Sequence, residues 1–82
     1  MTKNISAEVA VYSLSGADTR ELVSRAINIF EGMSLEYHTG AMSTLLKGEP
    51  DVVFEAIRRV FTECAGDHDV LLRCVISNHC PV

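Results

Sequence analysis

Apolar and polar residues alternate along the first part of the chain. From residue 5 to residue 14, apolar side chains recur at every second position, the period at which an extended strand returns to the same face. One face would carry Ile5, Ala7, Val9 and Val11, and the other Ser6, Glu8, Ala10 and Tyr12. The pattern predicts a β-strand with one strongly apolar face and one mixed face, which is free to meet solvent, a ligand or another subunit.

Two later stretches change to a helical period. The first is predicted to run from Asp18 or Thr19 to Glu31, with Asp18 and Glu21 arranged as in a capping box and Gly32 as its stop. Its apolar stripe consists of Leu22, Val23, Ala26, Ile27 and Phe30. The second is predicted to open at residues 48–51, with Pro50 near its first position, and to end at Gly66. Its stripe consists of Val53, Ile57, Val60, Phe61 and Cys64.

Three short extended stretches complete the pattern. Residues 35–39 and 42–47 read as strands joined through Gly40-Ala41, and a glycine in so short a link indicates a β-hairpin. Residues 68–77 read as a fourth strand, with enough apolar side chains to predict that both of its faces are partly covered.

The resulting order is strand, helix, strand, strand, helix, strand. Two βαβ units joined by a hairpin predict one ferredoxin-like βαββαβ domain over residues 1–82, an α+β sandwich with a four-stranded antiparallel sheet. Both helices would cover one sheet face. The other face, with Tyr12, Leu14, Leu71 and Val75 as its apolar candidates, has no helix of its own. A face of this kind needs a cover, so we expect a homo-oligomer, either a homodimer or a homotetramer.

Composition narrows the possible partners. The 82 residues carry a formal net charge of −4 with only seven basic residues, which disfavours nucleic-acid binding. No apolar run reaches the roughly 18–20 residues that a membrane helix needs, and Glu8 comes too early for a signal-peptide core. We therefore expect a cytoplasmic protein without a membrane partner.

The sequence carries no recognisable catalytic or metal-binding motif. Cys64, Cys74 and Cys80 are too few and wrongly spaced for an iron–sulfur site or a structural zinc site, and we expect the first two to be buried small hydrophobes. His79 beside Cys80 does not make a nucleophile–base pair, because such pairs are defined by spatial geometry. We expect no cofactor, no metal and no enzymatic activity.

Small polar side chains gather on the predicted hairpin and at the end of the last strand. They are His38, Thr39, Ser43, Thr44, Ser77 and Asn78. Taken singly, each is typical of a strand edge or a turn. As a group they suit a neutral, flat heterocycle, which needs a few placed donors and acceptors between aromatic or aliphatic walls. Tyr12 and Tyr37 are the amphipathic aromatic residues that could form such walls.

Several segments together resemble the YkoF-like thiamine- and hydroxymethylpyrimidine-binding family of small ferredoxin-like proteins. They are residues 10–14 (AVYSL), 41–49 (AMSTLLKGE), 53–57 (VFEAI) and 77–81 (SNHCP), and the resemblance covers about residues 6–81. It implies non-enzymatic binding of thiamine or its hydroxymethylpyrimidine moiety, with a role in vitamin salvage or transport. It also implies domains that work in multiples. YkoF carries two in one chain, so a second copy would have to supply the other here.

The resemblance assigns roles to single residues. Ser43 and Thr44 lie at the strand motif of the family and would contact the ligand, as would Tyr12 and Ser77. Gly40 departs from the polar, often acidic residue of YkoF-like chains. An acceptor for a ligand amino group would therefore have to come from His38, Glu36 or a backbone carbonyl.

Two other functions share this topology. An ACT-like domain would sense an amino acid at a subunit interface and would need a cation for its carboxylate, for which Arg73 is the available strand arginine. A purely structural oligomerisation domain would instead use a continuous apolar interface without a polar cavity.

Overall fold

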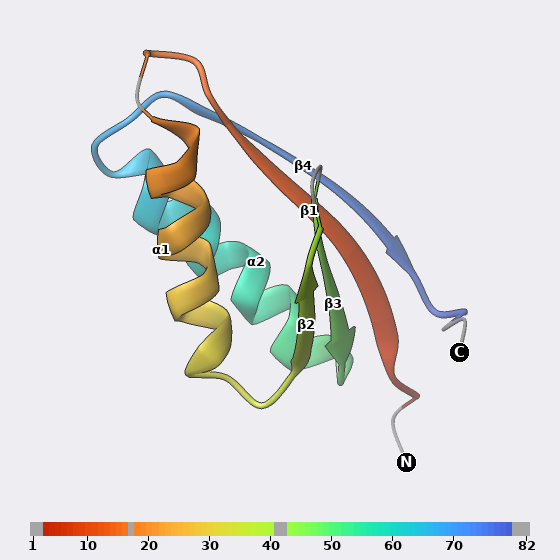
Figure 1. Ribbon diagram of the computed structural model, residues 1–82. Coiled ribbons are helices and arrows are strands. Elements are labelled where there is room, and N and C mark those ends of the chain that lie inside the picture. Colours follow the sequence, from red (N-terminus) through yellow and green to blue (C-terminus); the bar gives the residue numbers. More distant parts are fainter. Residues whose placement is uncertain (1–2, 17, 41–42, 80–82) are drawn as a thin grey trace.

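A computed structural model describes residues 3–16, 18–40 and 43–79 of the chain. The elements follow the predicted order: β1 (Ile5–Ser13), α1 (Thr19–Glu31), β2 (Glu36–Thr39), β3 (Thr44–Gly48), α2 (Pro50–Ala65) and β4 (Val70–Ser77). Both helices lie on the same side of the sheet (Figure 1). Of the helices in the described ranges, none has the length and apolar character needed to span a membrane.

The four strands form one antiparallel sheet in the order β2-β3-β1-β4. This order and the two helices confirm the predicted ferredoxin-like α+β fold. β1 is central and the longest strand, and its odd-numbered residues from Ile5 to Val11 are buried against the helices. Its register places Tyr12 opposite Leu71 and Glu8 opposite Val75, so these four side chains share the open face of the sheet.

Helix α1 begins at the predicted position. The side chain of Asp18 accepts a hydrogen bond from the backbone N–H of Arg20 at 2.9 Å, which satisfies one of the free donors at the helix start. The Arg20 side chain also contacts this carboxylate at 3.3 Å, and these bonds hold the Asp18 pKa below its ordinary value. Asp18 therefore caps the helix with Arg20 as its partner, and no bond returns from Glu21 to complete a capping box.

Helix α2 begins with Pro50 at its first turn, as predicted. Both helices end at the expected glycines, Gly32 and Gly66. Neither glycine adopts a positive φ; their values are −84° and −64°. Their role is thus to end the apolar helical pattern, and neither uses the left-handed conformation that favours glycine in helix caps.

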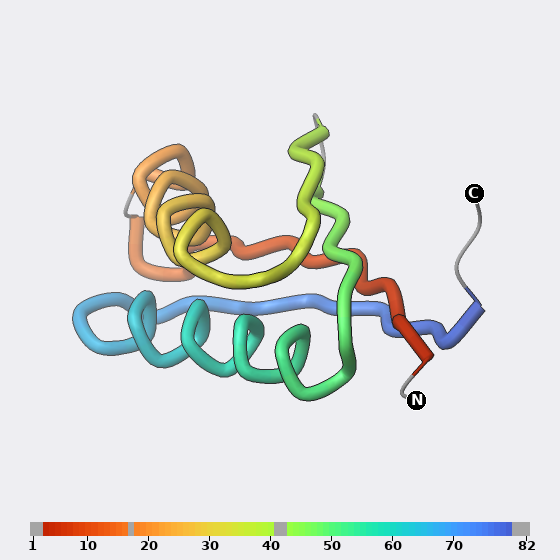
Figure 2. Tube along the Cα trace, turned by 90° about the horizontal axis from the view of Figure 1, so that it is seen from below, coloured from red at the N-terminus to blue at the C-terminus, as the bar shows by residue number. Residues whose placement is uncertain are grey.

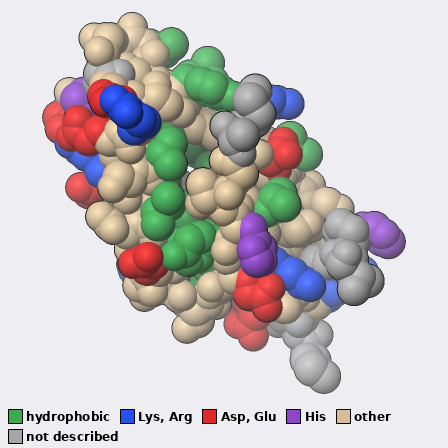
Figure 3. All heavy atoms as spheres, viewed as in Figure 1, with side chains coloured by type: hydrophobic (Ala, Val, Ile, Leu, Met, Phe, Trp, Pro, Cys, Tyr) green, Lys and Arg blue, Asp and Glu red, His purple; other side chains and the backbone are tan. Residues whose placement is uncertain are grey.

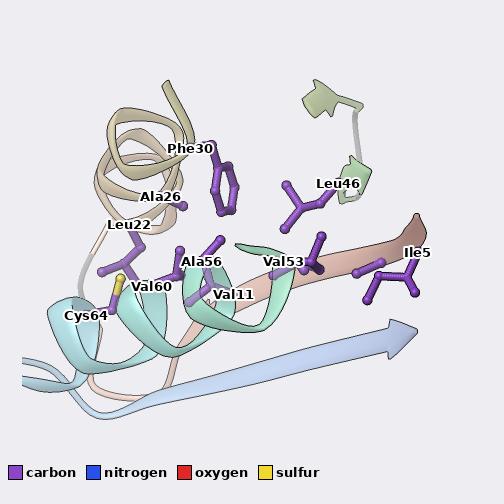
Figure 4. Close-up of a cluster of buried hydrophobic side chains, with 12 residues drawn as sticks. Ile5, Val11, Leu22, Ala26, Phe30, Leu46, Val53, Ala56, Val60 and Cys64 are labelled. Carbon is purple, nitrogen blue, oxygen red and sulfur yellow. The ribbon is translucent and has the colours of Figure 1, made fainter. Parts of the chain in front are cut away.

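The core lies between the two helices and the covered face of the sheet. Figure 4 shows Phe30 projecting from α1 into the space beside Leu46 of β3, and Cys64 of α2 pointing toward Leu22 of α1. These four side chains are at most 1% exposed. Burying a side chain as large as Phe30 or Leu22 contributes roughly 1.5–3 kcal/mol to folding. The remaining core residues are Ile5, Ala7, Val9, Val11, Ala26, Val53, Ala56 and Val60.

Three expectations about burial are wrong. Cys74, expected in the core, is exposed, and Phe61, expected on the buried stripe of α2, is 45% exposed. The fourth strand, expected to be partly covered on both faces, is exposed from Arg73 to Ser77. The exposure of Cys74 and of the rest of the strand has one cause: β4 is an edge strand whose C-terminal half extends away from both helices (Figure 1 and Figure 2). Phe61 is exposed because the buried stripe of α2 runs through Val53, Ala56, Val60 and Cys64 and leaves Phe61 beside it. Cys80 lies outside the described residues.

A bidentate ion pair links α1 to the connection between α2 and β4. The guanidinium of Arg25 donates to the two carboxylate oxygens of Asp67 at 2.9 and 3.1 Å, and it also contacts Glu21 at 3.0 Å. The hydrogen bonds from Arg25 lower the Asp67 pKa. The folded state therefore favours the ionised carboxylate, and this contribution to stability is lost as the pH falls through the lowered pKa.

We expect Asp67→Asn to lower the melting temperature at pH 7, because it removes the charge that pairs with Arg25. The difference from the wild type should shrink below about pH 4, where Asp67 takes up a proton in the unfolded chain and then in the folded protein. Thermal unfolding by circular dichroism at several pH values measures this. Asp51→Asn, at an exposed position in the first turn of α2, is the control. A difference that persists undiminished at pH 2 would contradict the ionic explanation.

Candidate functional site

The hairpin is shorter than the strand beside it, and this leaves a notch in the sheet. β3 pairs with β1 from Gly48 opposite Ile5 to Thr44 opposite Val9, while β1 continues to Ser13. The hairpin closes just beyond this point, where the N–H of Gly40 donates to the carbonyl oxygen of Ser43 at 2.8 Å. From residue 10 to residue 13, β1 therefore has β4 on one side, and no described residue of β3 pairs with it on the other.

A cavity of about 180 Å³ lies at this notch, between the sheet and α1. Its floor is the edge of β1 and the end of the hairpin, and its opposite wall is α1 with one contribution from α2. The lining residues are Val9, Ala10, Val11, Tyr12, Thr19, Val23, Ala26, Phe30, Thr39, Gly40, Ser43, Thr44 and Val60. On the face shown in Figure 3, hydrophobic side chains reach the surface among charged ones. Two other hollows, of about 480 and 440 Å³, are shallower and more open to solvent.

Hydroxyl groups supply the polar side chains of the cavity. They belong to Thr19 at the start of α1, Thr39 at the end of β2, and Ser43 and Thr44 at the start of β3. Elsewhere in the described ranges, Ser and Thr hydroxyls do form hydrogen bonds, at Ser15, Thr62 and Ser77. None of the four cavity hydroxyls forms one with another described residue.

Thr44 is the most informative of these residues. Its side chain is only 7% exposed, and it is the buried polar residue of the described chain. Its register opposite Val9 places it on the helix-covered face of the sheet, where the cavity lies. The fully enclosed side-chain atoms without a hydrogen-bond partner in the described ranges are Ser13 Oγ and His68 Nε2, so the Thr44 hydroxyl, which forms no hydrogen bond with another described residue, is accessible from the cavity. A polar group on the wall of a mostly apolar cavity normally has a hydrogen-bond partner. In this cavity a bound ligand could provide that partner.

The apolar walls come mainly from α1. Phe30, with Val23 and Ala26, lines the cavity, whereas Tyr37 does not. Tyr37 packs against Phe30 with ring centroids 6.0 Å apart and donates its hydroxyl to Glu31 at 3.0 Å. Burial and the neighbouring Glu31 carboxylate raise the Tyr37 pKa. Tyr37 thus supports Phe30 from behind, and Phe30 is the aromatic wall.

None of the described residues that line the cavity has a charged side chain. Among the residues that the structure describes, there is also no group of three or more His, Cys, Asp or Glu side chains that could hold a metal ion. The arrangement of aromatic and aliphatic walls with several free hydroxyls suits a small, uncharged, planar molecule. It offers no counter-ion for a phosphate or a carboxylate.

The structure brings together four of the seven residues that the sequence singled out for binding. Tyr12, Thr39, Ser43 and Thr44 all line the cavity, although strand alternation places the Tyr12 side chain on the open face. The other three, His38, Ser77 and Asn78, do not line it. His38 pairs with Leu45 on the open face, and Ser77 pairs with Ser6 toward the far end of β1. The hydroxyl of Ser77 accepts a hydrogen bond from the N–H of His79 at 2.9 Å.

Sequence reasoning missed Thr19 and Phe30 as site residues. Phe30 belongs to the apolar stripe of α1 and could not be distinguished from a purely structural core residue. Thr19 is the first residue of α1, next to the N-cap Asp18, and a single hydroxyl at a helix start gives no separate signal of a binding site. Only the position of α1 over the notch shows that both residues face the same cavity.

Residues 7–77 match the family model described as thiamine-binding protein. The chain therefore belongs to the thiamine-binding protein family. This member of the thiamine-binding family is 31% identical over 68 residues to UPF0045 protein MJ1052 of Methanocaldococcus jannaschii. The aligned region covers 82% of this chain and 68% of that protein.

Solved structures agree with the family assignment. The crystal structure of MJ1052 has a TM-score of 0.85 at 29% identity, covering 93% of this chain and 80% of the other. A domain of unknown function from Bacillus cereus has a TM-score of 0.81 at 25% identity, covering 94% and 77%. A Thermotoga maritima protein, named for a proposed role in thiamine biosynthesis or salvage, has a TM-score of 0.78 at 16% identity, covering 89% and 81%. At that identity the likeness shows the fold alone.

We expect Thr44→Val to leave the melting temperature of this thiamine-binding family member unchanged or to raise it when no ligand is added. Valine keeps the branched shape of this buried residue and removes a hydroxyl that forms no hydrogen bond with another described residue. Differential scanning calorimetry measures this. Thr62→Val is the control, because its exposed hydroxyl donates to the carbonyl oxygen of Arg58 at 3.0 Å. A drop of several degrees in Thr44→Val would show that the hydroxyl is satisfied within the protein.

Proposed function

We propose that this protein binds thiamine through its hydroxymethylpyrimidine moiety, or the free pyrimidine, in the cavity beneath α1, without chemical turnover. The observation that carries the proposal is the hydroxyl of Thr44, a buried residue, which lines a cavity without a charged residue in its described lining and bonds to no other described residue, in a thiamine-binding family member. Membership of that family supplies the ligand class. The name of the Thermotoga maritima protein of the same fold points to the same vitamin.

The size of the cavity favours one ring of the vitamin. An apolar cavity of about 150 Å³ accommodates a benzene-sized ring, whereas drug-sized ligands occupy about 300–1,000 Å³. The observed volume of about 180 Å³ therefore fits the substituted pyrimidine and leaves the thiazolium ring outside. The uncharged lining agrees, because it favours the neutral pyrimidine over the cationic ring or a phosphate ester.

Each part of the site has a defined role in this proposal. Phe30 covers one face of the pyrimidine, and Thr39, Ser43 and Thr44 offer hydroxyls to its polar edge. Tyr12 contacts the ligand at the edge of β1. His38, Ser77 and Asn78 lie elsewhere on the chain, so contact between them and the same ligand would require a second copy of the domain. We place the activity in the cytoplasm, in salvage or transport of the vitamin.

A site for an amino acid and a site for a neutral pyrimidine require different charges on the protein. An amino acid brings a carboxylate, and the strand arginine that could pair with it, Arg73, lies opposite Ala10 on the open sheet face. Arg73 does not line the cavity. The position of this cation therefore favours the neutral pyrimidine as the ligand of the cavity.

We expect the double variant Ser43→Ala/Thr44→Val to bind hydroxymethylpyrimidine about ten- to a hundredfold more weakly than the wild type. Each lost hydrogen bond removes roughly 0.5–1.5 kcal/mol of binding free energy. Isothermal titration calorimetry measures the affinity, with circular dichroism as the check of folding. Thr62→Val is the control outside the cavity and should bind as the wild type does.

The titrations also separate the competing functions. Saturable binding of hydroxymethylpyrimidine and thiamine, but of no amino acid, supports the proposal. Heat with an amino acid and none with the pyrimidine compounds would replace it with amino-acid sensing. Unchanged affinity in the double variant would remove Ser43 and Thr44 from the site. Absence of any binding would reject the ligand class and leave an oligomerisation domain.

We also propose that the protein is a homodimer or homotetramer that covers the open face of its sheet. Four large apolar side chains on or beside this face remain exposed: Tyr12 (40%), Leu45 (51%), Leu71 (47%) and Val75 (56%). We expect multi-angle light scattering at micromolar concentration to give a multiple of 9.0 kDa. Val75→Lys should shift the mass toward the monomer, whereas Lys3→Glu, at an exposed position outside the sheet, should not. A monomeric wild type would contradict this prediction.

A further inference from the structure

Four consecutive residues of β1, Val9 to Tyr12, line the cavity. Successive side chains of a strand point to opposite faces, and only Val9 and Val11 point toward the helices. A ligand beneath α1 can meet all four residues only along the edge of the strand, where the main chain runs. The notch therefore exposes the backbone of β1 to the cavity.

Hydrogen bonds elsewhere in the sheet show which backbone groups face the notch. The N–H of Leu14 donates to the carbonyl oxygen of Asp69, beside β4. In a strand, the N–H and C=O of one residue point to the same side, and the side alternates along the chain. The backbone N–H and C=O groups of even-numbered β1 residues therefore point toward β4, and those of odd-numbered residues point toward β3.

The hairpin gives the same result independently. Gly40 and Ser43 face each other across the hairpin, so the next residue, Thr44, turns its backbone toward β1 and meets Val9. One pair further along β1, the N–H and C=O of Val11 point to the β3 side of the strand, at the cavity that Val11 lines. Among the described residues, none of β3 pairs with Val11.

These backbone groups have a property that the side chains of the cavity lack. A hydroxyl either donates or accepts a hydrogen bond, and the polar side chains directed into the cavity are hydroxyls. Hydroxyls alone therefore cannot distinguish an amino group from a carbonyl oxygen on a ring. A backbone N–H only donates and a backbone C=O only accepts. Among the described residues, the N–H of Gly40 is already bonded to Ser43, whereas the N–H and C=O of Val11 present fixed polarity at the notch.

We propose that the main chain of Val11 determines the specificity of the site. It forms hydrogen bonds with the amino-substituted edge of a 4-aminopyrimidine. The exocyclic amino group donates to the carbonyl oxygen of Val11, and the adjacent ring nitrogen accepts from its N–H. The two contacts repeat the exchange of hydrogen bonds that Val9 and Thr44 make one step earlier in the ladder. The inference rests on the proposed pyrimidine-binding function and deepens it, since it gives the acceptor that no acidic side chain supplies.

The test is a titration of isotope-labelled protein with hydroxymethylpyrimidine, followed by nuclear magnetic resonance of the backbone amides. We expect the N–H signal of Val11 to move downfield on saturation. Ser13 is the internal control, because its N–H points to the same side of β1 but lies outside the cavity lining. Calorimetry with the analogue that lacks the 4-amino group should give roughly tenfold weaker binding.

A backbone ester at position 11 provides a matched variant. Replacing the amide of Val11 by an ester removes its N–H and keeps its buried side chain, and in an 82-residue chain this is accessible by chemical ligation. We expect weaker pyrimidine binding with little change in melting temperature, because no described residue of the sheet pairs with this N–H. An ester at Tyr12 should instead lower the melting temperature, because the N–H of Tyr12 points toward its partner strand β4.

The outcomes distinguish the role of the Val11 backbone from the proposed pyrimidine-binding function. Binding with a shifted Val11 amide and a weaker deamino analogue supports the inference. Binding that leaves the Val11 amide unmoved and treats both compounds alike overturns it, while the pyrimidine-binding function stands. Failure of hydroxymethylpyrimidine and thiamine to bind at all overturns both.

Discussion

The register between β1 and β3 is the constraint on which the site depends. Val9 lies opposite Thr44, and at this point the hairpin turns back while β1 continues for four more residues. A hairpin longer by one pair on each strand would cover the backbone of Val11 and close the notch. A shift of register by one residue would turn Thr44 away from the helices, because successive side chains face opposite sides. The cavity therefore results from unequal strand lengths as much as from the side chains that line it.

Much of the fold could be predicted because its signals are local. Asp18, Pro50 and the two helix-ending glycines mark the helix boundaries, and strict alternation marks β1. Burial on β4 could not be predicted in the same way. Its apolar side chains give the sequence pattern of a covered strand, but coverage depends on how far the helices extend across the sheet. A single sequence gives the polarity of Cys74, and it does not give the distance of this residue from a helix.

The candidate site was only partly predictable, for a related reason. Thr39, Ser43 and Thr44 attract attention as hydroxyls gathered on a hairpin, and they do line one cavity. Ser77 and Asn78 are chemically similar, but the sheet order places them far along β1 from the notch. Phe30 gives no separate signal, since a wall of a cavity and a residue of the core obey the same apolar pattern. The main chain of Val11 is invisible to any reasoning from residue types.

The uneven packing of β4 also determines how local openings of the protein should be distributed. Beyond Leu72 this strand keeps no buried side chain, so its C-terminal half is held mainly by backbone hydrogen bonds to β1. The β3 side of β1, in contrast, is backed by Leu46 and Val53 in the core. Regions with few buried contacts open at a lower free energy than the core does. The two edges of one strand should thus differ in hydrogen exchange, with the amides of Ser6 and Glu8 exchanging faster than those of Ala7 and Val9.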